Sequence, residues 1–357
     1  MKLAIAARSE TNVTRSNNED NLYCAGITLT PENCNEPFVL DTDTTTPCLI
    51  AVFDGMGGMA NGEYASLAAT QSLSEHADII KSEVEESANA VAVQKYVAET
   101  NQLLCRAMRE KASQFGTTLA LAVVTEETIL SYNLGDSRIY ALFEEDLKQI
   151  SVDHTLAAQK VKLGVLTPEQ ALTDKSRHRL SLHLGVFEDE FSVMAEELPS
   201  LPRASVRRLL LCTDGMTDGL KDTDIEEVLR KAQTVSDAAT QLIELALIKG
   251  RDNVTCIVLE ALEPEDDKEM PINPLPETRQ PADQIPADRI PTYMDNEAGR
   301  DGPLIRRVYI DHYGVDGSKG TVSEESGKPP NSQDPQDSQD SHNPMGNRLP
   351  TYMDESS

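Results

Sequence analysis

The sequence has little positive charge, no long apolar run and no closely spaced cysteine pair, and each deficit excludes a class of protein. Lys and Arg number 32 against 60 Asp and Glu, a formal charge of −28, so the chain repels nucleic acid and anionic lipid. No apolar run approaches the ~20 residues that a membrane span needs, and the apolar start before Arg8 is too short for a signal peptide. The six cysteines include no CxxC pair, which argues against structural zinc. We expect a cytoplasmic protein without nucleic-acid or membrane partners.

The composition changes near residue 262 and divides the chain in two. Residues 1–262 contain all six Phe and all six Cys and are long enough to form one large domain. Residues 263–357 are acidic, with a net charge of −11, and rich in proline. A segment such as SQDPQDSQDSH at 332–342 cannot bury enough apolar surface to offset its ordering entropy. We therefore expect a folded domain over 1–262 and a disordered tail over 263–357.

One short segment of the tail is duplicated. RIPTYMD at 289–295 recurs as RLPTYMD at 348–354, with a single conservative change. In each copy a threonine precedes an aspartate by three residues, which is similar to what phosphothreonine-reading forkhead-associated domains accept. We expect two docking motifs for such a partner; the alternative is a duplicated linker without function.

Groups of short strands alternate with long helices in the hydrophobic pattern. Strand patterns cover 1–7, 22–27, 48–54, 118–125, 128–134, 138–143, 206–212 and 254–260. Helical patterns cover 62–83, 88–114, 154–163, 223–232 and 236–249. The connections between 118–125, 128–134 and 138–143 are so short that they favour antiparallel hairpins over crossovers. The pattern predicts an α+β fold of helices packed on antiparallel sheets.

Five acidic residues share one local context, a strand end beside Gly or Asn where the backbone turns. A single Asp-Gly is more often a plain turn, but five matched positions are hard to explain as loops. Glycines beside them allow backbone or ligand to approach closely. The five positions are Asp20, Asp54, Asp136, Asp214 and Asp252.

The mutual repulsion of these carboxylates predicts a bound cation. If four of these carboxylates converge at about 5 Å, each pair repels by roughly 3 kcal/mol at an effective dielectric constant of about 20. Six such pairs total on the order of 20 kcal/mol, more than the roughly 5 to 15 kcal/mol stability of a domain. Because the ligands are all oxygens, the cluster favours Mg²⁺ or Mn²⁺ over zinc.

The same residues carry a family resemblance that spans residues 1–260 in order. The sequence resembles the metal-dependent protein Ser/Thr phosphatases of the PPM (PP2C) family, and their bacterial branch in particular. The motifs are Arg15 with Asn18-Glu19-Asp20, Asp54-Gly55-Met56-Gly57-Gly58, Gly116-Thr117-Thr118-Leu119, Leu134-Gly135-Asp136-Ser137-Arg138, Thr213-Asp214-Gly215 and Arg251-Asp252-Asn253-Val254-Thr255. The resemblance implies a PP2C-like sandwich of two antiparallel sheets flanked by helices, with 1–262 as the phosphatase domain.

The resemblance also implies a role for each site residue. Asp54 would bridge two Mn²⁺ or Mg²⁺ ions, with the Gly55 carbonyl on the second ion. Asp214 and Asp252 would complete the ligands of the first ion, Glu19 and Asp20 would act through bound waters, and Asp136 with Asp214 would hold a third ion. Arg15 would grip the phosphoryl oxygens, as a planar guanidinium can.

The implied activity is hydrolysis of phosphoserine and phosphothreonine in proteins, opposing bacterial Ser/Thr kinases. A water bridging two divalent ions is acidified and attacks phosphorus in line, so no protein nucleophile is needed. Animal members carry a His where this chain has Met56, which leaves the general acid unassigned.

Residues 154–191 correspond to the family's flap, a segment beside the metals that varies with substrate. Within it, His178 stands where bacterial relatives usually show Asn. His154 is expected to be structural, and Asn101 and Ser137 are expected to pack or hydrogen-bond locally.

Two alternatives remain. Phe38-Val39-Leu40-Asp41-Thr42-Asp43-Thr44 contains the DxDxT pattern of haloacid dehalogenase phosphatases, in which Asp41 would be the nucleophile. That class needs a long parallel sheet after the motif, and the next strand begins too soon, so we expect a hairpin loop here. The second alternative is a non-catalytic relative that binds phosphoproteins, against which the complete set of carboxylates argues.

Overall fold

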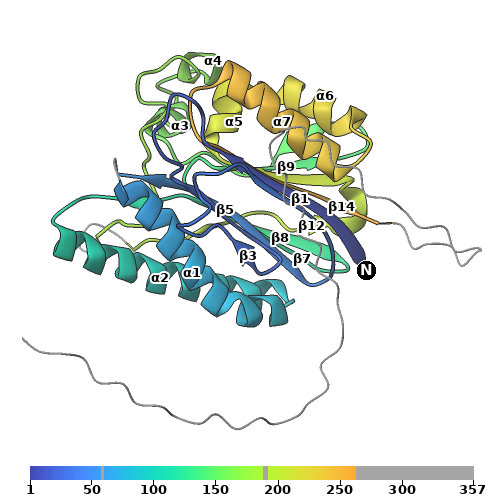
Figure 1. Cartoon of the computed structure of the whole chain (residues 1–357), viewed down its shortest axis with the longest axis horizontal. Coiled ribbons are helices and arrows are strands. Elements are labelled where there is room, and N and C mark those ends of the chain that lie inside the picture. The colour runs from blue at the N-terminus through green and yellow to red at the C-terminus, as the bar shows by residue number, and fades with distance from the viewer. Residues whose placement is uncertain (58–59, 188–191, 263–357) are drawn as a thin grey trace, which may run out of the picture. The chain divides into compact units, whose positions relative to one another are not determined.

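Two antiparallel sheets lie face to face at the centre of the protein, with helices on both outer faces (Figure 1). The computed structural model describes residues 1–57, 60–187 and 192–262. The predicted tail and both of its repeats lie outside the described residues.

The first sheet has six strands. Their order is β10 (Leu147–Gln149), β9 (Arg138–Leu142), β13 (Arg208–Cys212), β14 (Val254–Ala261), β1 (Lys2–Glu10) and β4 (Phe38–Thr45).

The second sheet has eight strands. Its main path is β11 (Glu196–Glu197), β8 (Thr128–Leu134), β7 (Leu119–Val124), β5 (Cys48–Met56), β2 (Asp20–Cys24) and β3 (Ile27–Thr28). Two short strands extend it, β12 (Leu201–Pro202) on β8 and β6 (Gly116–Thr117) on β5.

The long helices cover the two outer faces. The eight-stranded sheet carries α1 (Ala60–Ser82) and α2 (Glu86–Lys111), and the six-stranded sheet carries α5 (Asp214–Gly219), α6 (Asp222–Lys231) and α7 (Val235–Lys249). The short helices α3 (Leu156–Lys162) and α4 (Pro168–Ala171) lie between β10 and β11 in the chain. A 3₁₀ turn, Arg203–Ser205, follows β12. No helix in the described ranges is long and apolar enough to cross a bilayer.

The two-residue period of the strands builds three apolar layers. In β14, Ile257 and Leu259 pack between the sheets, whereas Cys256 and Val258 pack under α7. In β5, alternate residues likewise serve the core between the sheets and the core under α1 and α2. Because both faces of each central strand are buried, these strands read as continuous apolar runs in the sequence. The predicted α+β sandwich flanked by helices is confirmed.

Two local predictions were wrong. The strands β7 and β8 form the expected hairpin, but β8 and β9 do not pair: the turn at Gly135, where φ is +109°, carries the chain from one sheet to the other. The expected loop around Asp41 is instead the edge strand β4, antiparallel to β1. The Asp41 carboxylate lies 2.9 Å from Arg8 Nη2 and accepts a hydrogen bond from Ser236. Because β4 is the edge strand of an antiparallel sheet, the described fold lacks the long parallel sheet that the haloacid dehalogenase alternative requires.

Candidate metal centre

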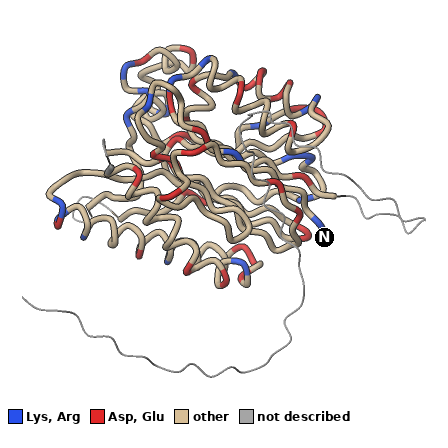
Figure 2. The backbone as a smooth tube through the Cα atoms, viewed as in Figure 1, with Lys and Arg blue, Asp and Glu red and all other residues tan. Residues whose placement is uncertain are grey.

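Two acidic residues face each other at one end of the sandwich. Asp20, the first residue of β2, is the Cα partner of Asp54 near the end of β5. Asp20 is 2% exposed. Figure 2 shows acidic positions gathered at this end of the two strand layers. The pairing register of β2 and β5 therefore places two like charges side by side in a poorly hydrated position.

The six-stranded sheet contributes Asp214, at the point where β13 gives way to α5. The preceding Thr213 donates its hydroxyl to Asp20 Oδ2 at 2.8 Å, so the two sheets meet here. Thr255 of β14 donates its N–H to the Thr213 hydroxyl at 3.0 Å, which fixes that hydroxyl. A Cβ on Gly215 would lie 2.0 Å from the Asn253 carbonyl, so only glycine lets α5 start this close to β14.

Asp252 lies immediately before β14 and binds the guanidinium of Arg15. Arg15 Nη2 donates to Asp252 Oδ2, and the two side chains are 44% and 28% exposed. Partial burial lowers the pKa of Arg15, but Asp252, Glu19 and Asp54 together outweigh it and the pKa is raised overall, so the guanidinium stays charged. The Arg15 guanidinium is therefore held at the rim of the carboxylate cluster and is partly open to solvent.

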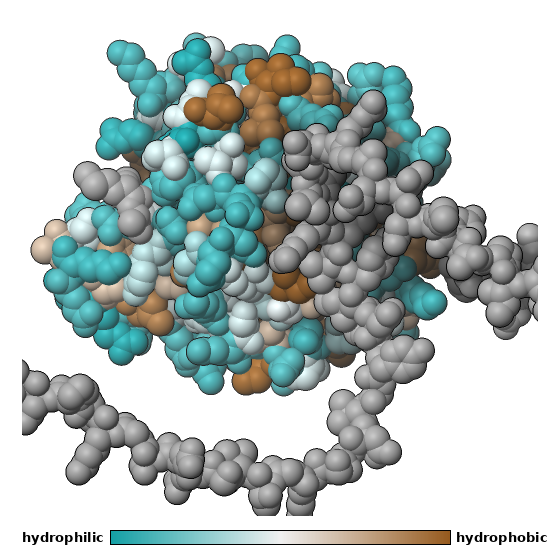
Figure 3. Space-filling model, viewed as in Figure 1, coloured by the Kyte–Doolittle hydropathy of each residue, from teal (hydrophilic) through white to brown (hydrophobic). Residues whose placement is uncertain are grey.

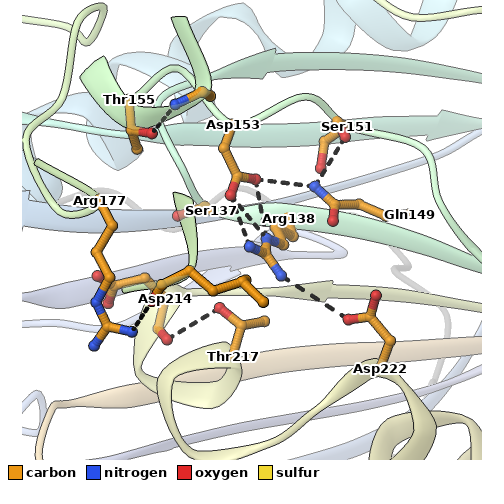
Figure 4. A network of polar contacts seen from close by, with 12 residues as sticks. Ser137, Arg138, Gln149, Ser151, Asp153, Thr155, Arg177, Asp214, Thr217 and Asp222 are labelled. Atoms are coloured by element: carbon orange, nitrogen blue, oxygen red, sulfur yellow. Dashed lines mark hydrogen bonds and ion pairs between the residues drawn. The ribbon is translucent and has the colours of Figure 1, made fainter. Parts of the chain in front are cut away.

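The turn between β8 and β9 supplies Asp136. The neighbouring Ser137 hydroxyl lies 2.6 Å from Thr118 Oγ1, which in turn accepts from the Asp54 backbone N–H at 2.9 Å. Arg138 braces the same turn through Asp153, whose carboxylate it contacts at 2.7 and 2.9 Å (Figure 4). Thus Asp136 and Asp54 are positioned by one continuous set of hydrogen bonds.

Glu19 and the backbone of Gly55 complete the group. Gly55 N donates to the Glu19 carbonyl at 3.1 Å. A Cβ on Gly62 of α1 would lie 2.7 Å from Glu19 Cδ and 2.8 Å from the Gly55 carbonyl oxygen. The helix can approach both groups only because residue 62 is glycine.

The cluster is electrostatically strained without a cation. Burial, then the neighbouring Asp214 and Asp20 carboxylates, raises the pKa of Asp54 well above its ordinary value. Burial likewise raises the pKa of Asp20 to about 8 and that of Asp214 to about 6. Asp136 shifts in the same direction, from burial and then from Asp214. Shared elevation of pKa values is what closely packed, desolvated carboxylates produce.

Residues 32–246 match the family described as Protein phosphatase 2C, which is more than half of the 357 residues. The chain belongs to the protein phosphatase 2C family. It is 31% identical over 220 residues to "Serine/threonine phosphatase stp" of Listeria monocytogenes, covering 59% of this chain and 84% of that protein. It is 31% identical over 277 residues to "Serine/threonine protein phosphatase PstP" of Mycobacterium tuberculosis, covering 76% of this chain and 47% of that protein.

Solved structures of the 2C family superimpose on the described fold. The Mycobacterium tuberculosis phosphatase PstP/Ppp matches with a TM-score of 0.59 at 29% identity, covering 74% of this chain and all of that one. The catalytic domain of PstP, solved in complex with two manganese ions, matches with a TM-score of 0.57 at 28% identity, covering 74% of this chain and 100% of that chain.

The sequence reading named eight residues for the site of this 2C-family chain, and the structure brings all eight to one end of the sandwich. They are Arg15, Glu19, Asp20, Asp54, Gly55, Asp136, Asp214 and Asp252. Sequence reasoning missed Gly62, although a glycine in the first turn of a long helix was a usable signal. The family motifs already included Thr118, Thr213 and Thr255, but the sequence assigned no role to the hydroxyls of Thr118 and Thr213 or to the Thr255 N–H, because their partners lie on other strands.

The described segment 154–187, which was predicted to belong to a flap, is held by hydrogen bonds near both ends. Near its start, His154 accepts from Gly135 N at 3.1 Å and lies 2.7 Å from Glu196, which supports the structural role expected of it. Near its end, Asn101 Oδ1 accepts from the N–H groups of Gly185 and Val186 at 2.8 and 3.0 Å. Asn101 was expected to pack or to hydrogen-bond locally, but its hydrogen bonds join α2 to residues 84 and 85 positions further along the chain.

A pocket of about 360 Å³ opens beside the cluster. Met56 and Gly57, which directly follow Asp54-Gly55, line one side, and Met108, Phe115 and Phe187 line the others. Hydrophobic side chains also reach the surface at the top of Figure 3, where Figure 1 labels α4 to α7; Leu163, Leu172 and Ile248 are 77%, 68% and 81% exposed. The pocket therefore places apolar side chains next to the segment that carries Asp54 and Gly55.

Proposed function

We propose that this phosphatase hydrolyses phosphoserine and phosphothreonine in proteins, with divalent cations held by the carboxylate cluster. The observation that carries the proposal is the convergence of four desolvated aspartates, with raised pKa values, beside one solvent-facing arginine. The metal-bound phosphatase of Mycobacterium tuberculosis supports it.

The donor set fits small, hard dications. Carboxylates and one backbone carbonyl are oxygen ligands, which Mg²⁺ and Mn²⁺ prefer. Asp54, the Gly55 carbonyl, Asp214 and Asp252 would hold two ions; Glu19 and Asp20 would act through waters, and Asp136 with Asp214 would hold a third. We favour Mn²⁺ as the activating ion in the assay because the related catalytic domain was solved with manganese.

The chain's own groups then bind and orient the phosphate ester. When bound, the cations supply an activated water and neutralise phosphoryl charge. Arg15 donates two parallel N–H bonds to phosphoryl oxygens, and Asp252 keeps its guanidinium aimed at the site. The pocket lined by Met56, Met108 and Phe115 accommodates an apolar side chain next to the phosphorylated residue.

The substrates follow from this chemistry. Phosphoproteins made by ATP-dependent Ser/Thr kinases arise where ATP is abundant, so we place the enzyme in the cytoplasm, acting against such kinases. Residues 1–262 would form the catalytic domain and residues 154–191 its flap. The two R(I/L)PTYMD repeats at 289–295 and 348–354 would dock a partner such as a forkhead-associated domain.

One assay tests the activity. The purified chain is given a phosphothreonine peptide with Mn²⁺, with Mg²⁺ and with a chelator, beside the variants Asp54→Asn and Asp214→Asn. We expect metal-dependent hydrolysis that chelation and either substitution abolishes. Asp41→Asn is the matched control, since Asp41 lies on an edge strand and pairs with Arg8, and it should retain activity. Hydrolysis that persists in the chelator would contradict the metal proposal.

A second assay tests the tail separately. Deletion of residues 263–357 should leave hydrolysis of a short peptide unchanged while binding of a forkhead-associated domain to the threonine-phosphorylated chain is lost. Equal binding by the full and the truncated chain would contradict docking through the repeats.

A further inference from the structure

A flap histidine lies against two carboxylates of α5. His178 Nδ1 is 3.9 Å from Asp214 Oδ2, and His178 Nε2 is 3.8 Å from Asp218 Oδ2. One donor atom from each of the three side chains lies within 4.8 Å of the other two. Asp218 follows Asp214 by four residues, so both carboxylates project from one face of the helix. The three groups form a compact triad at the edge of the carboxylate cluster.

The triad lacks any permanent positive charge of its own. In the described part of the chain, no Lys or Arg lies within ion-pair distance of Asp214 or Asp218. The side chains of His178 and Asp218 are 45% and 33% exposed, so an ion from solvent can reach them. A neutral imidazole with two carboxylates presents three donors and a net charge of −2.

The imidazole is delivered by ordered backbone. Arg179 O accepts from Leu156 N at 2.8 Å, and Arg179 N donates to Ser176 O at 3.1 Å, so hydrogen bonds flank His178. Lys160 adds contacts of 3.0 and 2.9 Å to Asp174 and to Ser176. Because the segment that carries it is fixed, His178 needs little reorganisation to act as a ligand.

We propose that His178, Asp214 and Asp218 form a mixed nitrogen and oxygen site for Zn²⁺, which ties the flap to α5. The carboxylate cluster has only oxygen ligands and suits Mg²⁺ or Mn²⁺. An imidazole nitrogen instead favours zinc-class ions and is a poor ligand for Mg²⁺. Three protein ligands and a water are a common zinc arrangement. The inference rests on the proposed function in one respect, because Asp214 also belongs to the carboxylate cluster.

Sharing Asp214 gives the site a regulatory consequence. A zinc ion held between the flap and α5 draws the Asp214 carboxylate toward His178 and away from the other residues of the carboxylate cluster. Zinc therefore lowers the activity of the manganese-loaded enzyme and restrains the flap over the site.

Zinc binding is the primary readout. The full-length chain, saturated with Mn²⁺, is titrated with Zn²⁺ by calorimetry and by competition with a zinc chelator at fixed pH. We expect His178→Asn and Asp218→Asn to weaken one zinc site by about tenfold or more, with Mg²⁺ binding by His178→Asn unchanged. Lys175→Asn, an exposed change three residues from His178 on the same segment, is the control and should bind zinc as the wild type does.

Proteolysis supplies a second readout that is independent of catalysis. Arg177 and Arg179 are exposed and flank His178, so trypsin can report on the flap. Zinc should slow cleavage at these two positions several-fold in the wild type and in Lys175→Asn, but not in His178→Asn.

Each outcome decides one question. Equal zinc affinity in the wild type and His178→Asn, with unchanged cleavage, would mean that the imidazole only pairs with the two carboxylates, and the proposal fails. Manganese-dependent hydrolysis by His178→Asn together with that result would leave the proposed function intact. If His178→Asn binds zinc more weakly than the wild type but the wild type hydrolyses no phosphopeptide, the zinc site is supported and the proposed function is wrong.

Discussion

Asp20 and Asp54 are Cα partners across β2 and β5, and in the described residues neither has a Lys or Arg within ion-pair distance. Their one neighbouring guanidinium, on Arg15, is engaged by Asp252. The Asp20 carboxylate accepts a hydrogen bond from the Thr213 hydroxyl, so the two desolvated carboxyl groups face each other without a side-chain cation paired to either of them in the described residues. The fold holds this repulsion in place because the register of two central strands enforces it.

Replacing one of these charges should stabilise the metal-free protein. Asp20→Asn keeps the shape and an acceptor for the Thr213 hydroxyl but removes a group that cannot ionise freely. We expect the Tm in chelator at pH 7.5 to rise by about 2–4 °C for each kcal/mol of repulsion removed. Manganese should stabilise the variant less than the wild type. A lower Tm for Asp20→Asn in chelator would contradict the strain; Asp41→Asn, whose carboxylate is paired with Arg8, should be destabilised instead.

The raised pKa values predict how stability varies with pH. The folded chain binds these protons more tightly than the unfolded chain, so the stabilisation is complete below the unfolded pKa near 4. It is lost as the pH rises through the folded pKa values of about 6 for Asp214 and about 8 for Asp20. The free energy of unfolding in chelator should therefore fall by up to about 1.4 kcal/mol per pH unit for each group between pH 5 and 8, and the Tm should fall with it.

Manganese should flatten that pH dependence, because a bound cation favours the ionised carboxylates. Thermal unfolding followed by circular dichroism across pH 5 to 8, with chelator and with Mn²⁺, gives both curves. A Tm in chelator that is constant or rises with pH would show that the carboxylates are not strained.

Sequence patterns predicted the parts of the site that are local. The apolar run ending in Asp54-Gly55 identified a central strand and its terminal carboxylate, because burial on both faces leaves a continuous apolar signal. The same held for Asp214 after β13 and Asp252 before β14. The family resemblance added the individual roles, which spacing alone did not define.

The errors came from tertiary context. Strand β4 contains Asp41 and Asp43, residues that disfavour strands, and forms because β1 pairs with it and Arg8 neutralises Asp41. The turn from β8 to β9 is as short as a hairpin, yet it crosses between stacked sheets, about 10 Å apart in such packings. The approach of His178 to α5 was equally invisible, since it joins segments that are 36 residues apart in the sequence.

Arg15 should contribute to phosphate binding through its planar geometry as well as its charge. Arg15→Lys keeps the charge but replaces two parallel donors with a single point charge. A charged hydrogen bond is worth about 1.5–3 kcal/mol, so we expect kcat/KM for a phosphopeptide to fall by roughly 10- to 150-fold. The metal affinity should change far less. Arg106→Lys, at an exposed position of α2, is the control and should keep the wild-type kcat/KM.

Gly62 tests whether the approach of α1 to the site matters. In an ordinary helix, Gly→Ala would stabilise the protein by roughly 0.5–1 kcal/mol. Here the added methyl group would lie 2.7 Å from Glu19 Cδ and 2.8 Å from the Gly55 carbonyl oxygen, so the helix must shift away from both groups. We expect Gly62→Ala to weaken manganese binding by about tenfold, as measured by calorimetry, and to lower the Tm.

A matched change on the same helix separates the contact from helix propensity. Gln71 is exposed on α1 and far along the helix from residue 62, so Gln71→Ala should leave manganese binding and activity at the wild-type level. If Gly62→Ala also binds manganese normally and is more stable than the wild type, the helix can yield without disturbing Glu19 or Gly55. The close approach of α1 would then be incidental to the metal centre. If Gly62→Ala weakens manganese binding and Gln71→Ala does not, the close approach of α1 at Gly62 holds the Gly55 carbonyl and the Glu19 carboxylate in place.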